Sequence, residues 1–157
     1  MAWSNSKIFS AYITDIINNT TAMDLNTDAS IKVALYDNDI TPDQTVASAN
    51  TAYNVGQWVT TGNEVFEAGQ WAQGGVAITS PTSTFTTNVY TFDAADTASG
   101  SAADLASVFG CLVYDDTIAT PVVDQGICFN YFGGSNSVVN GTFTVVWNAS
   151  GIFALTL

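Results

Sequence analysis

The first twenty residues carry apolar side chains at the spacing of an amphipathic helix. These positions, at i, i+1, i+4, i+5, i+8 and i+9, are Ile8, Phe9, Tyr12, Ile13, Ile16 and Ile17. The spacing places them on one stripe of an α-helix, which Ser4 or Asn5 can cap and which residues 18–21 end. The stripe has two interpretations: a helix packed on its own domain, or an N-terminal arm over residues 1–29 that docks on a neighbouring subunit.

From Ser30 onward the pattern changes to short β-forming runs separated by Gly, Asn, Asp and Pro. The runs that we expect to be strands are 30–37, 76–79, 85–93, 108–114, 122–132, 142–147 and 151–157. Pro81 separates the second run from the third. About seven strands after one N-terminal amphipathic helix predict a mainly β fold, an antiparallel β-sandwich or barrel. Residues 30–157 are expected to form a single domain.

A turn-forming segment separates the last two runs. Residues 148–151, Asn-Ala-Ser-Gly, lie between two strongly β-forming stretches. We therefore expect residues 142–147 to fold back against residues 152–157 as a hairpin. The chain ends on an apolar strand without a polar tail, so this strand must be buried in a sheet or covered by a neighbour.

The two cysteines lie in the preceding pair of runs, which the acidic loop 115–121 connects. A hairpin there places Leu112 opposite Phe129. It also places Cys111 opposite Cys128 or one step from it. Because a slip of one residue moves every side chain to the other face of the sheet, two states stay open. The cysteines are either buried thiols or a cross-strand disulfide.

An irregular segment, residues 38–75, lies between the first two runs and is rich in glycine and aromatic residues. It is too aromatic for a disordered linker and too broken for long strands. We expect an ordered surface excursion pinned by its aromatic side chains, and such loops commonly contact partners. Together with the N-terminal stripe, this segment provides the candidate interaction residues Ile8, Phe9, Tyr12, Tyr53, Trp58, Phe66 and Trp71.

The charge balance restricts the chemistry that this chain can perform. Its 157 residues include only two basic ones, Lys7 and Lys32, against 14 acidic residues and no histidine, for a net charge of −12. Histidine-dependent catalysis, histidine-ligated zinc, arginine clamps on phosphate and a nucleic-acid-binding face all need residues that are absent. Carboxylate chemistry, an oxygen-ligated metal or a non-enzymatic role remains, and we expect no nucleic-acid partner.

Glu64 and Glu67 are the only glutamates, and they lie close in sequence to Trp58 and Trp71. A glycosidase needs two carboxylates facing each other across a cleft, and sugar clefts combine acids with aromatic rings. An interface rim uses the same residue types. Because neither arginine nor histidine nor a second matching acidic pair accompanies the glutamates, we expect no enzyme and no catalytic residues.

Two acidic clusters are the candidates for metal binding. They are Asp37, Asp39 and Asp43, and Asp115, Asp116 and Asp124. The first begins like a calcium loop, but Pro42 stands where an EF-hand requires glycine and no glutamate closes the loop. We interpret both clusters as acids in solvated turns and expect no metal and no cofactor, with a calcium site of another type as the open alternative.

The sequence also restricts the compartment. The N-terminus lacks a basic segment followed by an apolar run, so it does not read as a signal peptide. No stretch approaches the ~18 consecutive apolar residues of a membrane helix. We therefore expect a protein that is made soluble in a cytoplasm and has no membrane partner.

Several segments resemble parts of one group of proteins when they are taken in order. They are residues 31–36 with 41–43, 63–65 with 74–78, 92–96, 112–117 and the long ending 140–153. In this order they resemble small virion structural proteins of tailed bacteriophages. The resemblance implies a non-enzymatic protein of the virion, assembled in the host bacterial cytoplasm, with no catalytic residues to transfer.

The physical properties of the chain agree with such a role. A coat protein needs a compact β fold, few flexible charged side chains, polar surfaces for wide contacts and an apolar arm or end. An acidic surface is repelled by packaged DNA, which favours the outside of a particle. The leading hypothesis is a capsid decoration (cement) protein that self-associates and binds the major capsid protein or other virion proteins.

Two alternatives stay open. A neck, tail or fibre component would expose the aromatic segment 53–71 as a receptor-facing tip. A carbohydrate- or calcium-binding module would instead use the acidic and aromatic residues as a ligand site.

Overall fold

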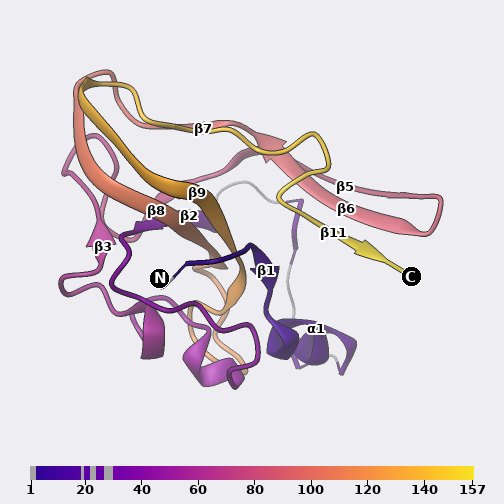
Figure 1. The fold of residues 1–157 in the computed structure, drawn as a ribbon. Coiled ribbons are helices and arrows are strands. Elements are labelled where there is room, and N and C mark those ends of the chain that lie inside the picture. The colour runs from indigo at the N-terminus through magenta and orange to yellow at the C-terminus, as the bar shows by residue number, and fades with distance from the viewer. Residues whose placement is uncertain (1–2, 19, 22–23, 27–29) are drawn as a thin grey trace.

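The structure is a computed structural model that describes residues 3–18, 20–21, 24–26 and 30–157. It is mainly β, with 46% of residues in strands and 9% in helices, and its sheets are antiparallel with a single α-helix near the N-terminus. This confirms the predicted fold class, and the arrangement of the sheets fits a sandwich (Figure 1). None of the described helices is long and apolar enough to cross a membrane.

The described residues form eleven strand segments where about seven were expected. Three of the additional segments are two-residue pairings, which are too short to leave a hydrophobic period in the sequence, and the fourth arises because residues 79–95 form two strands. In chain order the elements are β1 (Lys7–Ile8), α1 (Ser10–Ile17), β2 (Ile31–Tyr36), η1 (Ser48–Asn50), η2 (Gly56–Trp58), β3 (Glu64–Val65), β4 (Val76–Ala77), β5 (Thr79–Thr86), β6 (Val89–Ala95), β7 (Thr97–Ala98), β8 (Ala103–Asp115), β9 (Gly126–Gly141), β10 (Thr144–Val145) and β11 (Phe153–Thr156).

The main sheet is built around the long, curved hairpin of β8 and β9 (Figure 1). Its strand order is β1-β9-β8-β2-β3, and β4 also pairs with β2. β2 pairs with β8 along its whole length, from Ile31 opposite Asp115 to Tyr36 opposite Gly110. Five of the six β2 residues are buried, so both faces of this strand are covered, which explains its nearly continuous apolar sequence.

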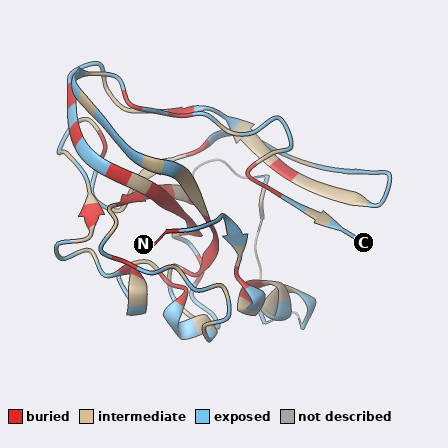
Figure 2. Ribbon diagram, in the orientation of Figure 1, coloured by how far each residue is buried: buried red, intermediate tan, exposed pale blue. Residues whose placement is uncertain are grey.

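Aromatic side chains from distant parts of the chain fill the centre of the core. The ring of Trp58 lies 5.2 to 6.0 Å, centroid to centroid, from the rings of Trp3, Phe9, Tyr36 and Phe129. All five side chains are at most 1% exposed. Figure 2 shows that the buried residues gather along β2, β8 and the start of β9. Edge-to-face packing of this kind adds to the stability that burial alone provides.

The N-terminal segment contributes to this core and is not a separate arm. The indole of Trp3 packs against Gly110, where a Cβ atom would lie only 2.6 Å from the ring. Its Nε1 donates a hydrogen bond of 2.6 Å to the Asp37 carbonyl oxygen. Residues 3–17 therefore share one core with the β domain, as the first interpretation of the apolar stripe expects. Residues 1–2, 19, 22–23 and 27–29 of the predicted arm lie outside the described residues.

Helix α1 begins later than the hydrophobic period predicts. β1 holds Lys7 and Ile8 in the sheet opposite Phe129 and Cys128 of β9, so the helix starts only after Phe9. Phe9 is the N-cap and makes no side-chain cap hydrogen bond. The prediction that Ser4 or Asn5 caps the helix is therefore wrong. The predicted end is confirmed, because Asn18 is the C-cap.

A three-stranded sheet with the order β11-β6-β5 projects from the body of the molecule (Figure 1). The run 85–93, predicted as one strand, is split between β5 and β6. Thr87 and Asn88 both have positive φ, 51° and 62°, and form the two-residue turn between these strands. Pro81 does not separate two strands as predicted but lies within β5, at the edge of the sheet, where a missing N–H is tolerated.

The predicted C-terminal hairpin is wrong, although its turn forms. Asn148 and Gly151 form an isolated bridge, as expected for residues 148–151. The flanking strands then enter different sheets, because β10 pairs with β7 and β11 pairs with β6. β11 forms four consecutive residue pairs with β6, whereas β10, the predicted partner, is only two residues long.

The register of β8 and β9 confirms one predicted pair and corrects another. Leu112 lies opposite Phe129 as predicted. Cys111 lies opposite Asn130, while Cys128 lies opposite Val113, so the two cysteines are diagonal neighbours and do not face each other. Both are buried and free. Of the two predicted states, the structure holds the buried thiols.

Candidate functional site

The structure places four of the seven predicted interaction residues in the core, which corrects their assignment as contact residues. Phe9, Tyr12, Trp58 and Trp71 are at most 1% exposed. The indole Nε1 of Trp71 points inward and donates a hydrogen bond of 3.1 Å to the Val33 carbonyl oxygen. The aromatic segment 53–71 is therefore anchored by its tryptophans, and they do not form an exposed tip.

The other three predicted residues retain accessible surface but lie apart. Ile8 is half-buried in β1, Phe66 is 44% exposed after β3, and Tyr53 lines a polar hollow. The structure does not bring these side chains together on one surface. The surfaces that remain as candidates are the polar hollow, a second pocket beside β10, and an apolar groove beside α1.

The polar hollow has a volume of about 480 Å³ and lies beside β2. Its charged and phenolic lining residues are Lys32, Tyr53, Tyr114, Asp116 and Asp124. The rings of Tyr53 and Tyr114 are stacked, with centroids 4.9 Å apart. Lys32 and Tyr114 are cross-strand partners on β2 and β8, so both side chains leave the sheet on the same face.

Glu64 connects this hollow to the glycine turn before β4. Its carboxylate accepts hydrogen bonds from the Tyr53 hydroxyl at 2.8 Å and from the Gly74 N–H at 2.7 Å. The Tyr114 hydroxyl donates to the Gly74 carbonyl oxygen at 2.6 Å. Burial raises the pKa of the Glu64 carboxyl, and the hydrogen bonds from Gly74 and Tyr53 oppose this shift. Glu64 therefore acts as a buried acceptor that joins two loops.

The remaining charges of the hollow interact with one another. Lys32 Nζ lies 2.6 Å from an oxygen of Asp116. Burial, and then the neighbouring Asp116, raises the pKa of Asp124, while Lys32 lowers it. The lysine is thus paired with a carboxylate, and this pairing holds β2 against the loop after β8.

The predicted pair of glutamates does not face a common cleft. While Glu64 holds Tyr53 and Gly74, the Glu67 carboxylate accepts a hydrogen bond of 2.6 Å from the backbone N–H of Asp104. Each glutamate therefore fastens a different part of the chain, Glu64 the loops at Tyr53 and Gly74 and Glu67 the start of β8. This geometry does not provide the opposed acid and base, or acid and nucleophile, of a glycosidase.

Carboxylates of the acidic clusters mostly accept hydrogen bonds from residues of their own turns. Asp37 accepts a hydrogen bond from the Asp39 N–H, Asp43 accepts two from Thr45, and Asp115 accepts two from Thr117. These are side-chain turns of the kind that aspartate favours. Within the part of the chain that the structure describes, no three acidic or cysteine side chains are grouped so as to hold a metal ion.

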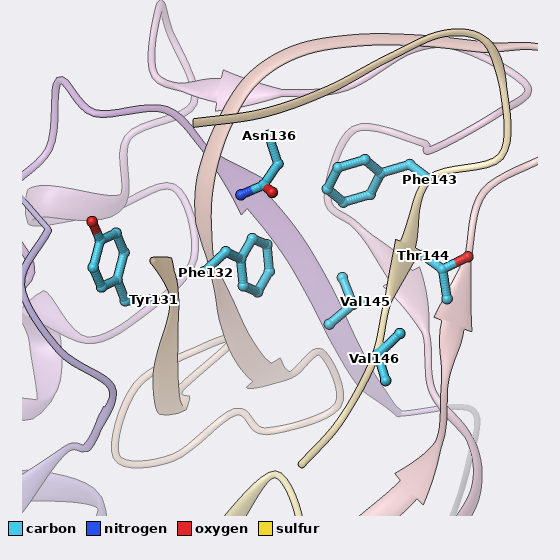
Figure 3. Close-up of a pocket in the computed structure, with 7 residues that line it drawn as sticks. All are labelled: Tyr131, Phe132, Asn136, Phe143, Thr144, Val145 and Val146. Carbon is cyan, nitrogen blue, oxygen red and sulfur yellow. The ribbon is translucent and has the colours of Figure 1, made fainter. Parts of the chain in front are cut away.

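A second pocket, of about 350 Å³, lies between β9 and β10 (Figure 3). Phe132 and Phe143 lie on different sides of this pocket, and Val145 and Val146 lie at its lower end in this view. Of its polar side chains, Asn136 donates to the backbone carbonyl oxygens of Gly134 and Val108. The pocket thus combines polar and apolar side chains, and Val146 at its border is 70% exposed.

The third surface, here named the apolar groove, has a volume of about 410 Å³ and lies between α1 and the projecting sheet. Ile13, Ile16 and Ile17 of α1 line one side, and Phe85, Tyr90 and Leu155 of the sheet line the other. Three side chains at the groove are strongly exposed for apolar residues: Ile17 at 75%, Phe85 at 59% and Leu157 at 83%. None of the described residues that line the groove is charged.

Sequence reasoning identified one component of this groove and missed the others. The apolar ending was expected to need a cover, and its alternating Phe153, Leu155 and Leu157 all line the groove. Phe85 and Tyr90 were not singled out, because the split of residues 85–93 into two strands was not predicted. Cross-strand pairing places Phe85 next to Tyr90, and Tyr90 next to Leu155.

Comparison of the chain with protein-family models, with curated proteins and with solved structures finds no match.

Proposed function

We propose that this chain is a non-enzymatic structural protein of a bacteriophage virion, and more specifically a capsid decoration protein that binds the outer shell. The observation that carries the proposal is the position of its exposed apolar side chains. In a chain with a net charge of −12, three of the exposed large apolar side chains, Ile17, Phe85 and Leu157, gather at the groove, whose described lining is free of charge. Exposed apolar patches of this kind mark contact sites on proteins.

A decoration protein needs at least two contact surfaces, one for the shell and one for a neighbouring molecule. The apolar groove supplies one of them. The pocket beside β10, with Phe132, Phe143 and the exposed Val146, supplies the other (Figure 3). We assign the shell contact to the second surface, because it carries the exposed Val146 and because its residues come from elements other than those of the groove.

The polar hollow supports a structural role in a different way. Glu64, Tyr53, Tyr114 and Lys32 are engaged in hydrogen bonds or an ion pair that join strands and loops. A site built for catalysis keeps an acid or base directed at its substrate, and this arrangement directs those groups at the protein itself. The sequence resemblance to phage virion proteins agrees with this interpretation.

The charge supports a position on the outside of the particle. The 14 acidic residues against two basic ones would repel packaged DNA and would leave an outward-facing surface highly hydrated. A protein that binds only the assembled shell stabilises that shell by mass action. The expected consequence is a particle that withstands higher temperature when the protein is present.

The test is to purify virions of the phage that encodes this chain and to quantify the polypeptide against the major capsid protein by gel densitometry. A copy number near that of the major capsid protein is expected. A small number of copies per particle would contradict a decoration role and would favour a neck, tail or fibre component. Isothermal titration with calcium and with a panel of glycans tests the ligand-binding alternative, for which we expect no heat of binding.

A further inference from the structure

We propose that two copies of this chain associate through the open edge of the projecting sheet, beside the apolar groove, with their β11 strands pairing antiparallel about a two-fold axis. The second copy would be the neighbouring molecule that contacts one of the two surfaces proposed above, and the dimer depends on the proposed function only for its biological setting. Four properties of the projecting sheet carry it: an open strand edge, an apolar face, the absence of charge, and a geometry that closes on itself.

The first property is the open edge of the sheet. Among the described residues, β11 pairs only with β6, and β5 forms the opposite edge. β5 is protected against further pairing, because it contains Pro81, a positive φ at Ser80 and a register shift between Thr79 and Thr82. β11 has no proline, no glycine and no charged side chain. Of the two edges, β11 is therefore the one that can accept another strand.

The second property is the two-sided character of this sheet. Phe85, Tyr90 and Leu155 form one cross-strand row, and alternation places Phe153 and Leu157 on the same face. The opposite face carries Thr84, Thr91 and Ala154 in the neighbouring row. The apolar face is turned toward α1, and its outer end remains exposed at Phe85 and Leu157. One copy thus leaves this face only partly covered.

The third property is the charge pattern. Two molecules that each carry a charge of −12 repel each other over most of their surfaces. At the groove this repulsion is weakest, because the lining side chains are uncharged and the nearby Asp15 of α1 is directed elsewhere. Its carboxylate accepts hydrogen bonds from Ser48 at 2.6 Å and from Gln125 at 2.7 Å. An identical copy of the groove is thus an electrostatically acceptable partner.

The fourth property is geometric closure. When a strand pairs antiparallel with its own copy, the two are related by a two-fold axis perpendicular to the sheet. The combined sheet would then have the order β5-β6-β11-β11-β6-β5, with both apolar faces on the same side. The middle of β11, at Ala154 and Leu155, would lie at the axis, and exposed Leu157 of one copy would lie beside the start of β11 of the other. Such a contact is isologous and stops at two copies, so it does not propagate into fibres.

The experiment measures the self-association of the full chain by sedimentation equilibrium across a range of concentrations. We expect a monomer–dimer equilibrium with dimer as the largest species. Leu157→Asp places a carboxylate at each end of the β11–β11 seam and should raise the dimer dissociation constant by about tenfold or more. Phe85 lies on β5, at the outer edge of the combined sheet, so Phe85→Asp should have a much smaller effect. Val139→Asp is the matched control, because Val139 is also 83% exposed but lies outside the groove. It should leave the dissociation constant within about twofold of the wild type.

A separate variant tests the strand pairing. Ala154 is exposed on β11 and lies on the threonine face, away from the groove lining. Ala154→Lys places a charge on the edge, as natural edge strands do to prevent pairing, and should also weaken the dimer by about tenfold. Circular dichroism and thermal unfolding of each variant establish that the monomer remains folded.

Three outcomes would overturn the proposal: a wild-type chain that stays monomeric at every concentration, a dimer that tolerates both Leu157→Asp and Ala154→Lys, or a dimer that Val139→Asp disrupts equally. If the free chain is monomeric but the groove variants fail to join virions, the groove binds another virion protein and the second copy is not its occupant. A dimer found together with a low copy number in virions would contradict the decoration role and leave this proposal standing.

Discussion

The side-chain amide of Gln125 donates a hydrogen bond of 2.7 Å to the carboxylate of Asp15, 110 residues earlier in the chain. Gln125 is fully buried, and its carbonyl oxygen accepts a hydrogen bond of 2.7 Å from the Thr21 hydroxyl. Asp15 also accepts one from Ser48. This network fastens α1 to the residue before β9 and to η1, so it fixes the helix side of the apolar groove.

Replacing Gln125 with leucine should destabilise the protein by about 1–3 kcal/mol. The substitution replaces the amide with an apolar side chain of similar size and leaves the half-buried Asp15 carboxylate and the buried Thr21 hydroxyl without this partner. Urea unfolding measures the loss. Gln57→Leu serves as the control, because Gln57 bonds to the backbone of Asp43 in an exposed position and its loss should cost less than about 1 kcal/mol. Equal losses for the two variants would contradict the structural role of the network.

Trp58 should contribute far more to stability than Phe66 of the same aromatic segment. Trp58→Ala removes a fully buried indole that contacts four other rings, and we expect a loss of about 3–5 kcal/mol. Phe66→Ala removes a ring that is 44% exposed and should cost less than about 1 kcal/mol. Thermal and urea unfolding provide both values. A Trp58→Ala variant as stable as the wild type would contradict the aromatic core.

The two cysteines should be unreactive while the protein is folded. Burial raises the pKa of the Cys128 thiol to about 12 and raises the pKa of Cys111 well above its usual value. Because the thiolate is the reactive form, native protein should not be labelled by a thiol reagent at pH 8. Both cysteines should react at once in guanidinium. Fast labelling of one cysteine in the native protein, or an intact mass that shows a disulfide, would contradict this prediction.

Glu64 should make stability depend on pH in a direction opposite to that of an ordinary paired carboxylate. Burial raises the pKa of its carboxyl in the folded protein above the unfolded value of about 4.3. Between these two pKa values the folded state binds more protons than the unfolded state. The contribution of Glu64 to the free energy of unfolding therefore falls as the pH rises through this window, and no difference remains below it.

Glu64→Gln removes this titration, so its stability should fall less steeply with rising pH than that of the wild type. Urea unfolding of both proteins from pH 4 to pH 8 compares the slopes directly. Asp37 and Asp124, whose pKa values are also raised by burial, titrate in both proteins and cancel in the difference. Parallel curves would show that Glu64 keeps its ordinary pKa.

The hydrophobic period predicted the elements that bury one continuous face. β2 was expected over residues 30–37 and observed as Ile31–Tyr36, and the N-terminal helix was recognised from its stripe. The period did not resolve strands held by only two pairs, such as β1. It also did not separate β5 from β6, because the Thr87–Asn88 turn contains no glycine or proline.

The candidate surface was harder to predict because it is assembled from distant segments. Trp58 and Trp71 lie among glycines and polar residues in the sequence, which suggests exposure, yet both indoles are buried in the core. The apolar groove combines Ile17, Phe85 and Leu155 from three separate elements. Local sequence indicated that the C-terminal strand needed a cover. The side chains that lie beside this strand are set by the pairing of β11 with β6, whereas the sequence predicted a pairing with β10.

The pairing of β1 with β9 determines when this chain can fold during synthesis. Lys7 lies opposite Phe129, and the Trp3 ring lies 6.1 Å from the ring of the same residue. At a synthesis rate of about 5–20 residues per second, the ribosome needs on the order of ten seconds to make the intervening chain. During that period the N-terminal aromatic side chains lack their native neighbours. Folding therefore begins late, from nearly the whole chain, and proceeds slowly because its central contacts are remote in sequence.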